Sequence, residues 1–228
     1  MTPLAPLHFD DAREAAGLAA FLRRLLHYDR AAAVRLQGGG GALAVFGRPP
    51  SFEVIAIRTA RLVDAVDLDV TVSAGELLEG IEESAGKAVV PDAVTGPPWA
   101  GVLPPRAGWE PVAGLPDAAA MRGAVGAAVA EFRARDEALP EERRTRAERD
   151  RIGREIWSRT LSGTGLPLRA VHAAQSLGFL PDLPGEAGAD LPVALFAAGP
   201  WLRLRTPYGS VALRTVPTSL TVTLASTR

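Results

Sequence analysis

The residues best suited to binding chemistry lie near the end of the chain, in residues 201–214. Strand alternation places Trp201, Arg203 and Arg205 on one face, with leucines on the other, and Arg214 follows on the returning strand. No acidic residue lies between residues 196 and 228 to neutralise these arginines. Such a surface could bind phosphates, an acidic protein or a stacked base. The simpler alternative is the outer face of an ordinary antiparallel sheet.

A proline-rich segment, residues 91–115, supplies two more candidate binding residues, Trp99 and Trp109; we call this segment the strap. Its prolines are Pro91, Pro97, Pro98, Pro104, Pro105 and Pro111. They predict that the strap forms no regular secondary structure. A flexible linker would be polar, but the strap also carries Val102 and Leu103. We therefore expect the strap to lie extended against a packed surface.

Neither catalytic residues nor metal ligands are indicated by the sequence. His8, His27 and His172 are scattered, and no two of them have the spacing that places metal ligands on one helical face. Cysteine is absent, as is a Gly-x-Ser-x-Gly motif. We expect no metal and no cofactor. His172 could serve as a base, but a structural histidine is the preferred interpretation, and an enzyme is the weakest functional hypothesis.

Two conspicuous motifs have structural interpretations. The glycines of residues 38–41 are followed by a strand rather than a helix, which favours a hairpin loop over a phosphate site. Residues 141–159 are rich in arginine, but aspartate and glutamate residues lie four positions away from many of these arginines, where a helix would bring the opposite charges together. This stretch is therefore interpreted as a solvated helix face rather than a nucleic-acid surface.

Helices and strands that could position these residues follow from the hydrophobic periodicity. The sequence predicts helices over residues 10–28, 73–81, 115–140, 140–159 and 167–177. It predicts strands over residues 32–36, 42–46, 52–57, 68–72, 193–196, 201–205, 211–214 and 220–224. Ser73, three residues before Glu76, is the expected N-cap of its helix. The fold class is α+β: antiparallel strands with an N-terminal covering helix, a central helical hairpin and a C-terminal β-hairpin.

The length of the chain allows one large domain or two small ones. We expect residues 1–228 to form a single compact α+β unit. The alternative is an N-terminal α+β part (1–90) and a C-terminal helix-plus-hairpin part (116–228), joined by the strap.

The composition narrows the classes of function. A formal net charge of −1 lacks the basic excess of a dedicated nucleic-acid binder, so nucleic acid is possible but not favoured. The N-terminal residues do not form a secretory signal, and no run is apolar enough to span a membrane. Lys87 is the only lysine and asparagine is absent, which indicates a high-GC bacterial genome. We expect a cytoplasmic protein.

One segment resembles a known family. Residues 67–81, DLDVTVSAGELLEGI, are similar to the strand-then-helix unit of sterol carrier protein 2-like domains. In that family a sheet and helices surround an apolar cavity. The resemblance implies, as the alternative function, a carrier of a lipid or another small apolar ligand.

The main functional hypothesis is a non-catalytic interaction or regulatory module that binds an unknown protein partner or anionic ligand through the basic hairpin. Its candidate binding residues are Trp201, Arg203, Arg205, Arg214, Trp99 and Trp109.

Overall fold

The computed structural model describes residues 6–161, 163–181 and 192–215. Its helices are α1 (Ala12–Tyr28), α2 (Ala74–Glu79), α3 (Ala118–Glu137), α4 (Arg146–Trp157) and α5 (Leu168–Ser176), with 3-10 turns η1 (Pro98–Gly101) and η2 (Glu141–Arg143). Its strands are β1 (Leu7–His8), β2 (Ala33–Gly39), β3 (Ala42–Gly47), β4 (Ile55–Arg61), β5 (Leu68–Ser73), β6 (Ile81–Glu82), β7 (Lys87–Ala88), β8 (Glu110–Val112), β9 (Ala194–Ala198), β10 (Trp201–Thr206) and β11 (Gly209–Arg214).

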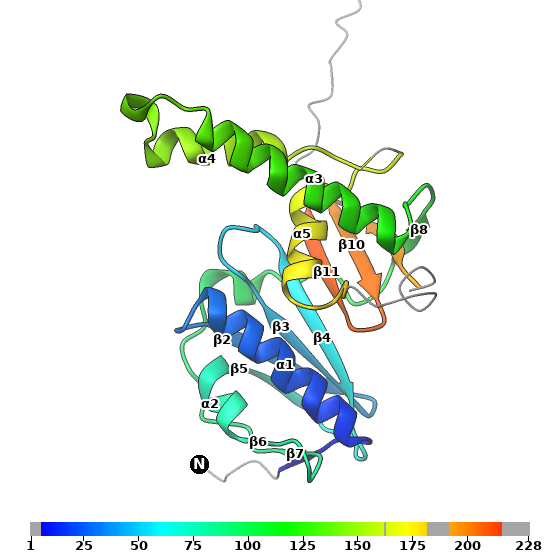
Figure 1. Cartoon of the computed structure of the whole chain (residues 1–228). Coiled ribbons are helices and arrows are strands. Elements are labelled where there is room, and N and C mark those ends of the chain that lie inside the picture. The colour runs from blue at the N-terminus through cyan, green and yellow to red at the C-terminus, as the bar shows by residue number, and fades with distance from the viewer. Residues whose placement is uncertain (1–5, 162, 182–191, 216–228) are drawn as a thin grey trace, which may run out of the picture.

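One antiparallel sheet runs through both halves of the molecule. Its eight strands have the order β5-β2-β3-β4-β11-β10-β9-β8, and the halves join where β4 pairs with β11 (Figure 1). Ile55, Ala56 and Ile57 there lie opposite residues 210–212. The strands β1, β7 and β6 form a separate small sheet.

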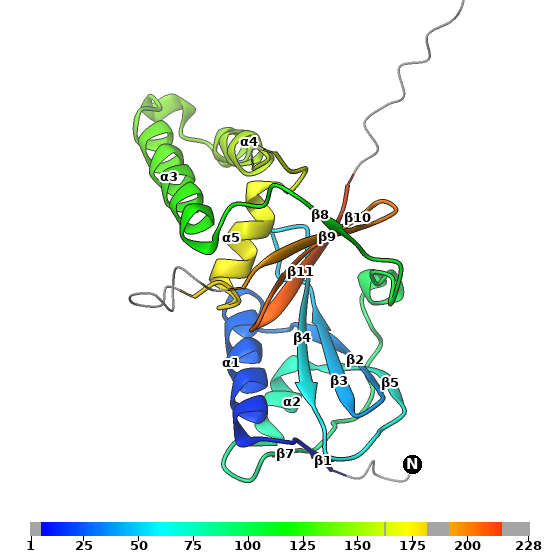
Figure 2. The same ribbon diagram turned by 90° about the vertical axis from the view of Figure 1, so that its right-hand side faces the viewer.

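Helices cover one face of the large sheet, which we call the helix face. Figure 2 shows α1 and α5 on this side, with the strap and its short coil η1 on the other. Strand alternation directs Leu204 and Val211 toward the helices, where both are fully buried. Phe21 of α1 and Phe179, just after α5, stack with ring centroids 5.4 Å apart. The helix face therefore forms one apolar core across both halves of the sheet.

Side-chain caps explain where several helices begin. The Asp11 side chain caps α1 by accepting a hydrogen bond from the Arg13 backbone N–H. The Asp117 side chain caps α3 by accepting one from the Ala120 backbone N–H. Ser73 Oγ accepts from the Glu76 backbone N–H at 3.3 Å, which confirms the predicted cap of α2.

The helices α3 and α4 form a hairpin that projects from the sheet (Figure 1). Ion pairs join the two helices: Arg135 to Glu155 at 2.7 Å and Arg159 to Glu131 at 2.5 Å. These contacts hold the pKa of Glu155 at about 2, chiefly through its hydrogen bonds with Arg135. Most of the arginines of residues 141–159 that form ion pairs therefore do so with acidic residues of the same helical hairpin.

The predicted fold class is confirmed: the fold is α+β, with antiparallel strands, a covering α1, the α3–α4 hairpin and the β10–β11 hairpin. Several details differ from the sequence prediction. The helix expected over residues 140–159 begins only at Arg146, after η2, the helix expected over residues 73–81 ends at Glu79, and the sequence predicts no strand at β1, β6 or β7. β4 begins at Ile55 rather than residue 52, because Ser51 and Glu53 adopt positive φ in the preceding turn. The strap was expected to lack regular structure, but it contains η1 and β8. The expected strand over residues 220–224 lies outside the described residues.

None of the helices in the described ranges is long and apolar enough to cross a membrane.

Candidate functional site

The predicted basic side of the C-terminal hairpin is one continuous surface of the sheet, on the side away from the helices; we call it the strap face. In the ladder between β10 and β11, Trp201 lies opposite Arg214, Arg203 opposite Ala212, and Arg205 opposite Ser210. Residues directly opposite each other point to the same side. Register therefore brings all four hairpin candidates to the strap face.

The strap brings the remaining two candidates to the same face. Trp99 and Trp109 pack against a small apolar cluster that contains Trp201. The members of this cluster are Phe46, Ile55, Ile57, Trp201 and Ala212. The Trp109 indole N–H donates to the Pro105 carbonyl oxygen at 2.9 Å, which fixes the ring within the strap. The six residues singled out in the sequence thus come together around one sheet face.

Trp201 differs from the prediction, because the sequence alone suggested an aromatic ring open to a base or a partner. Only 9% of Trp201 is exposed, since the strap covers it. The Arg214 guanidinium lies 5.9 Å from the centre of its ring. Trp201 is therefore an anchor for the strap, and base stacking on it is not available.

Arg203 is the most buried of the candidate arginines. It is half-buried; its Nη2 donates to Ser210 Oγ at 3.1 Å, and its guanidinium carbon lies 5.8 Å from the centre of the Trp109 ring. Its Nε is buried without a hydrogen-bond partner, and Arg203 makes no ion pair with any residue that the structure describes. Burial, and then repulsion from Arg205, lowers the pKa of Arg203. Arginine nevertheless remains charged at neutral pH, so its positive charge lacks a counter-charge.

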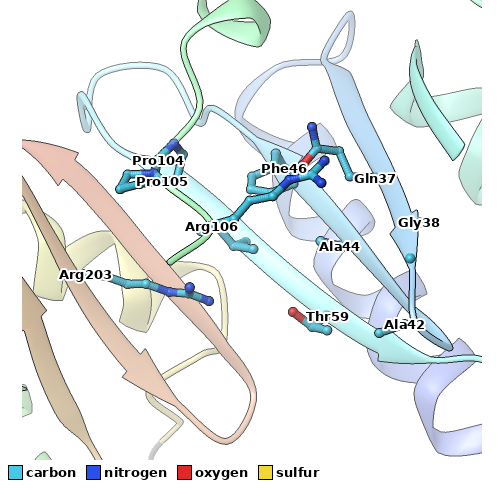
Figure 3. A pocket seen from close by; sticks show the side chains of 12 residues that line it. Gln37, Gly38, Ala42, Ala44, Phe46, Thr59, Pro104, Pro105, Arg106 and Arg203 are labelled. Carbon is cyan, nitrogen blue, oxygen red and sulfur yellow. The ribbon is translucent and has the colours of Figure 1, made fainter. Parts of the chain in front are cut away.

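A groove of about 280 Å³ opens beside Arg203 on the strap face; we call it the Arg203 groove. Figure 3 shows Arg203 extending from the C-terminal hairpin toward the space between Arg106 and Thr59. Small residues, among them Gly38, Ala42 and Ala44, form much of its lining and leave the space open.

The polar lining of the Arg203 groove suits an anion. It consists of two guanidinium groups, from Arg203 and Arg106, an amide from Gln37 and a hydroxyl from Thr59, and no carboxylate is among the lining residues. The neighbouring Asp69 already accepts hydrogen bonds from Arg35 at 2.7 Å and from Gln37 at 3.3 Å. The bond from Arg35 is the main cause of its lowered pKa, to which Arg106 also contributes. Asp69 is thus engaged outside the groove.

The other two arginines of the hairpin lie outside the Arg203 groove. Arg205 is exposed, with its guanidinium carbon 5.8 Å from the centre of the Phe196 ring, and Arg214 is exposed above Trp201. Sequence reasoning missed Arg106, Gln37 and Thr59. Arg106 could have been noticed as a cation directly after Pro104 and Pro105. Gln37 and Thr59 carry no local signal, because strand pairing alone brings them to this face.

Two of the histidines contact aromatic rings. His172 stacks on Trp157 with ring centroids 4.4 Å apart and meets Phe52 edge-on, and burial lowers its pKa. His27 meets Tyr28 edge-on. In the part of the chain that the structure describes, no three His, Cys, Asp or Glu side chains come together as metal ligands.

Two family models match the chain. Residues 2–101 match the model described as Domain of unknown function (DUF8010), and residues 104–218 match the one described as Domain of unknown function (DUF8185). The boundary between the two matches falls inside the strap. No curated protein matches the chain.

Proposed function

The chain belongs to the family described as Domain of unknown function (DUF8185), and because that description gives no ligand, we propose from the site itself that the protein is a non-catalytic interaction module. It binds an acidic segment of a partner protein on the strap face. One carboxylate of that segment enters the Arg203 groove, between Arg203 and Arg106. Exposed Arg205 attracts further acidic residues of the same segment.

The observation that carries this proposal is the missing counter-charge of Arg203. Burial of a guanidinium without an opposite charge is costly, and such groups are ordinarily paired or neutralised. The Arg203 Nε has no hydrogen-bond partner, yet the side chain borders an open groove. A carboxylate in the groove would supply both the charge and hydrogen-bond acceptors.

The charge distribution favours an acidic protein over nucleic acid. Nucleic-acid binding relies on neutralising many phosphates along a strand, whereas Arg203 and Arg106 are the only cations among the lining residues of the groove, and the ring of Trp201 is buried. The apolar-ligand alternative has less support, because every pocket described on the molecule is lined by at least one arginine.

The test uses a fluorescein-labelled hexaglutamate peptide, with binding measured by fluorescence anisotropy at low ionic strength. The wild type binds the peptide, and hexaglutamine does not bind. Loss of one charge-assisted contact in Arg203→Gln or Arg106→Gln weakens binding about tenfold. Arg106 is exposed, so its replacement leaves the fold intact.

The matched control is Arg13→Gln, which removes an exposed arginine from α1 on the opposite side of the sheet. We expect this variant to bind the peptide like the wild type, and added salt to weaken binding to both. Equal affinities for the wild type and the groove variants would overturn the proposal. Displacement of the peptide from the groove by oligothymidylate at lower concentration would reassign the site to nucleic acid.

A further inference from the structure

A second pocket lies between the strap, the start of β4 and the end of β11, and α5 also contributes to its lining. Trp99, Val102 and Trp201 line this pocket, which we call the tryptophan pocket, while Pro104 and Pro105 of the strap line the Arg203 groove. Its volume is about 310 Å³, at the lower end of the ~300–1,000 Å³ typical of small-molecule sites. No lining residue is shared between the two.

Three arginines from separate elements line the tryptophan pocket. Arg48 comes from the turn between β3 and β4, Arg169 from α5 and Arg214 from the end of β11. The only acid in the lining is Glu53, whose side chain is 70% exposed and lies 3.5 Å from Arg169 Nε. The lining therefore carries a net excess of two positive charges.

Among the described residues, the surroundings of Arg169 only partly compensate its positive charge. Its Nε is buried without a hydrogen bond, although it forms the ion pair with Glu53. It also occupies the first turn of α5, where the helix dipole disfavours a cation and where this helix carries no acidic residue. Both features would be relieved by an anion bound between the arginines.

The backbone of the turn before β4 is held in an unfavourable conformation beside the tryptophan pocket. Ser51 has φ 70° and Glu53 has φ 54°, values that non-glycine residues seldom adopt. Such conformations persist where the surroundings enforce them and are often found at ligand sites. The turn fixes Arg48 and Glu53 at the rim.

The remaining lining is apolar and sets the class of ligand. Trp99, Trp201, Ile55 and Ala212 belong to or pack against the small apolar cluster of the strap face. We propose that the tryptophan pocket binds a small organic anion, a flat apolar body bearing one carboxylate or phosphate group. The apolar body contacts the partly exposed Trp99 and the exposed Val102, and the oxyanion meets the guanidinium groups of Arg48, Arg169 and Arg214. This site is separate from the Arg203 groove and does not depend on its proposed function.

Isothermal titration calorimetry with phenyl phosphate and with benzoate tests this inference on the full chain. We expect binding with one-to-one stoichiometry. Benzyl alcohol, which lacks the charge, and inorganic phosphate, which lacks the apolar body, bind at least about tenfold more weakly. The variants are Arg48→Gln and Arg214→Gln, both at exposed positions, so that unfolding does not obscure the result.

Each variant should weaken phenyl phosphate binding about tenfold, because it removes one charged contact to the oxyanion. The control Arg13→Gln removes an exposed arginine far from the pocket and should bind like the wild type. No binding of either aromatic anion, or equal binding by all four proteins, would overturn the inference. Equally tight binding of inorganic phosphate would refute the role of the apolar wall.

Discussion

Two arginines on opposite faces of the same sheet show how differently this protein treats buried charge. On the helix face, Arg58 of β4 lies against Gly17 of α1 so closely that even a methyl group there would collide with it. Its Nη2 pairs with Glu14 at 3.3 Å, and its Nη1 donates to the Tyr208 carbonyl oxygen at 3.2 Å. On the strap face, Arg203 has the Ser210 hydroxyl and an aromatic ring, but no acid among the described residues.

Burial lowers the pKa of both arginines, but opposite neighbours then act on them. Glu14 raises the pKa of Arg58, whereas Arg205 lowers the pKa of Arg203 further. The helix face therefore supplies the counter-charge of its buried arginine from within the fold, although Arg58 Nε, like Arg203 Nε, is buried without a hydrogen-bond partner. On the strap face, no described residue supplies a counter-charge to Arg203, and we propose that a bound partner supplies it. This difference between the two arginines is the physical basis of the proposed binding role.

The largest expected effect is a loss of stability on replacing Arg58, whereas replacing Arg203 should change stability little. Arg58→Met leaves Glu14, only 16% exposed, with the exposed Arg61 as its remaining ion-pair partner at 3.2 Å, and it also removes the hydrogen bond to Tyr208, so the free energy of unfolding should fall by about 1–3 kcal/mol. Arg203→Met loses one charge-assisted hydrogen bond, to the Ser210 hydroxyl, but it also removes a half-buried charge that lacks a counter-charge, so the change should stay within about 1 kcal/mol. Urea denaturation of the two variants and the wild type measures both values. Similar losses in the two variants would show that Arg203 is a structural group like Arg58.

A smaller effect is expected on the pH dependence of stability. It comes from His172, which is half-buried like Arg203 but, unlike an arginine, can lose its proton near neutral pH. Burial lowers its pKa below the usual value of about 6.5, so the folded state favours the neutral ring. Well above pH 6.5 the ring is neutral in both the folded and the unfolded state, so its contribution to stability is constant. As the pH falls below 6.5, the unfolded chain binds the proton first and stability decreases, until the folded ring is also protonated.

Thermal melts between pH 8 and pH 5.5 test this expectation against His172→Phe, which keeps a flat ring between Trp157 and Phe52. The wild type should lose more stability than the variant as the pH falls. Parallel pH profiles would mean that the folded protein accommodates the charged ring at no cost. Arg203 cannot lose its proton in this range, and this is why the two buried bases call for different explanations.

The parts of the site that could be predicted from the sequence rest on local patterns. Alternation with a period of two residues was sufficient to place Trp201, Arg203 and Arg205 together, and the ladder with β11 confirms this placement. The Ser73 cap likewise depends on residues three positions apart.

The rest depends on pairings between distant residues, which no local pattern records. Residue 57 of β4 pairs with residue 210 of β11, and this pairing aligns the sheet beneath the strap. Only that alignment shows that Trp201 is covered and that Arg106 and Arg203 line the same groove. The strand β8 was missed because Pro111 suggested irregular structure, although proline is compatible with an edge strand. The single compact unit remains a prediction, which the shared sheet favours.

The most direct test of the central claim observes the two arginine side chains while the hexaglutamate peptide binds. Arginine Nε–H signals are resolved in two-dimensional ¹H–¹⁵N NMR spectra and can be assigned with Arg203→Gln and Arg58→Met. We predict that the Arg203 Nε–H signal shifts progressively and saturates with the peptide, because a carboxylate beside the guanidinium changes the electrostatic environment of the whole group. The Arg58 signal should stay in place, because Glu14 already supplies its counter-charge. An unchanged Arg203 signal at saturating peptide would contradict the claim that the counter-charge of Arg203 comes from a bound partner.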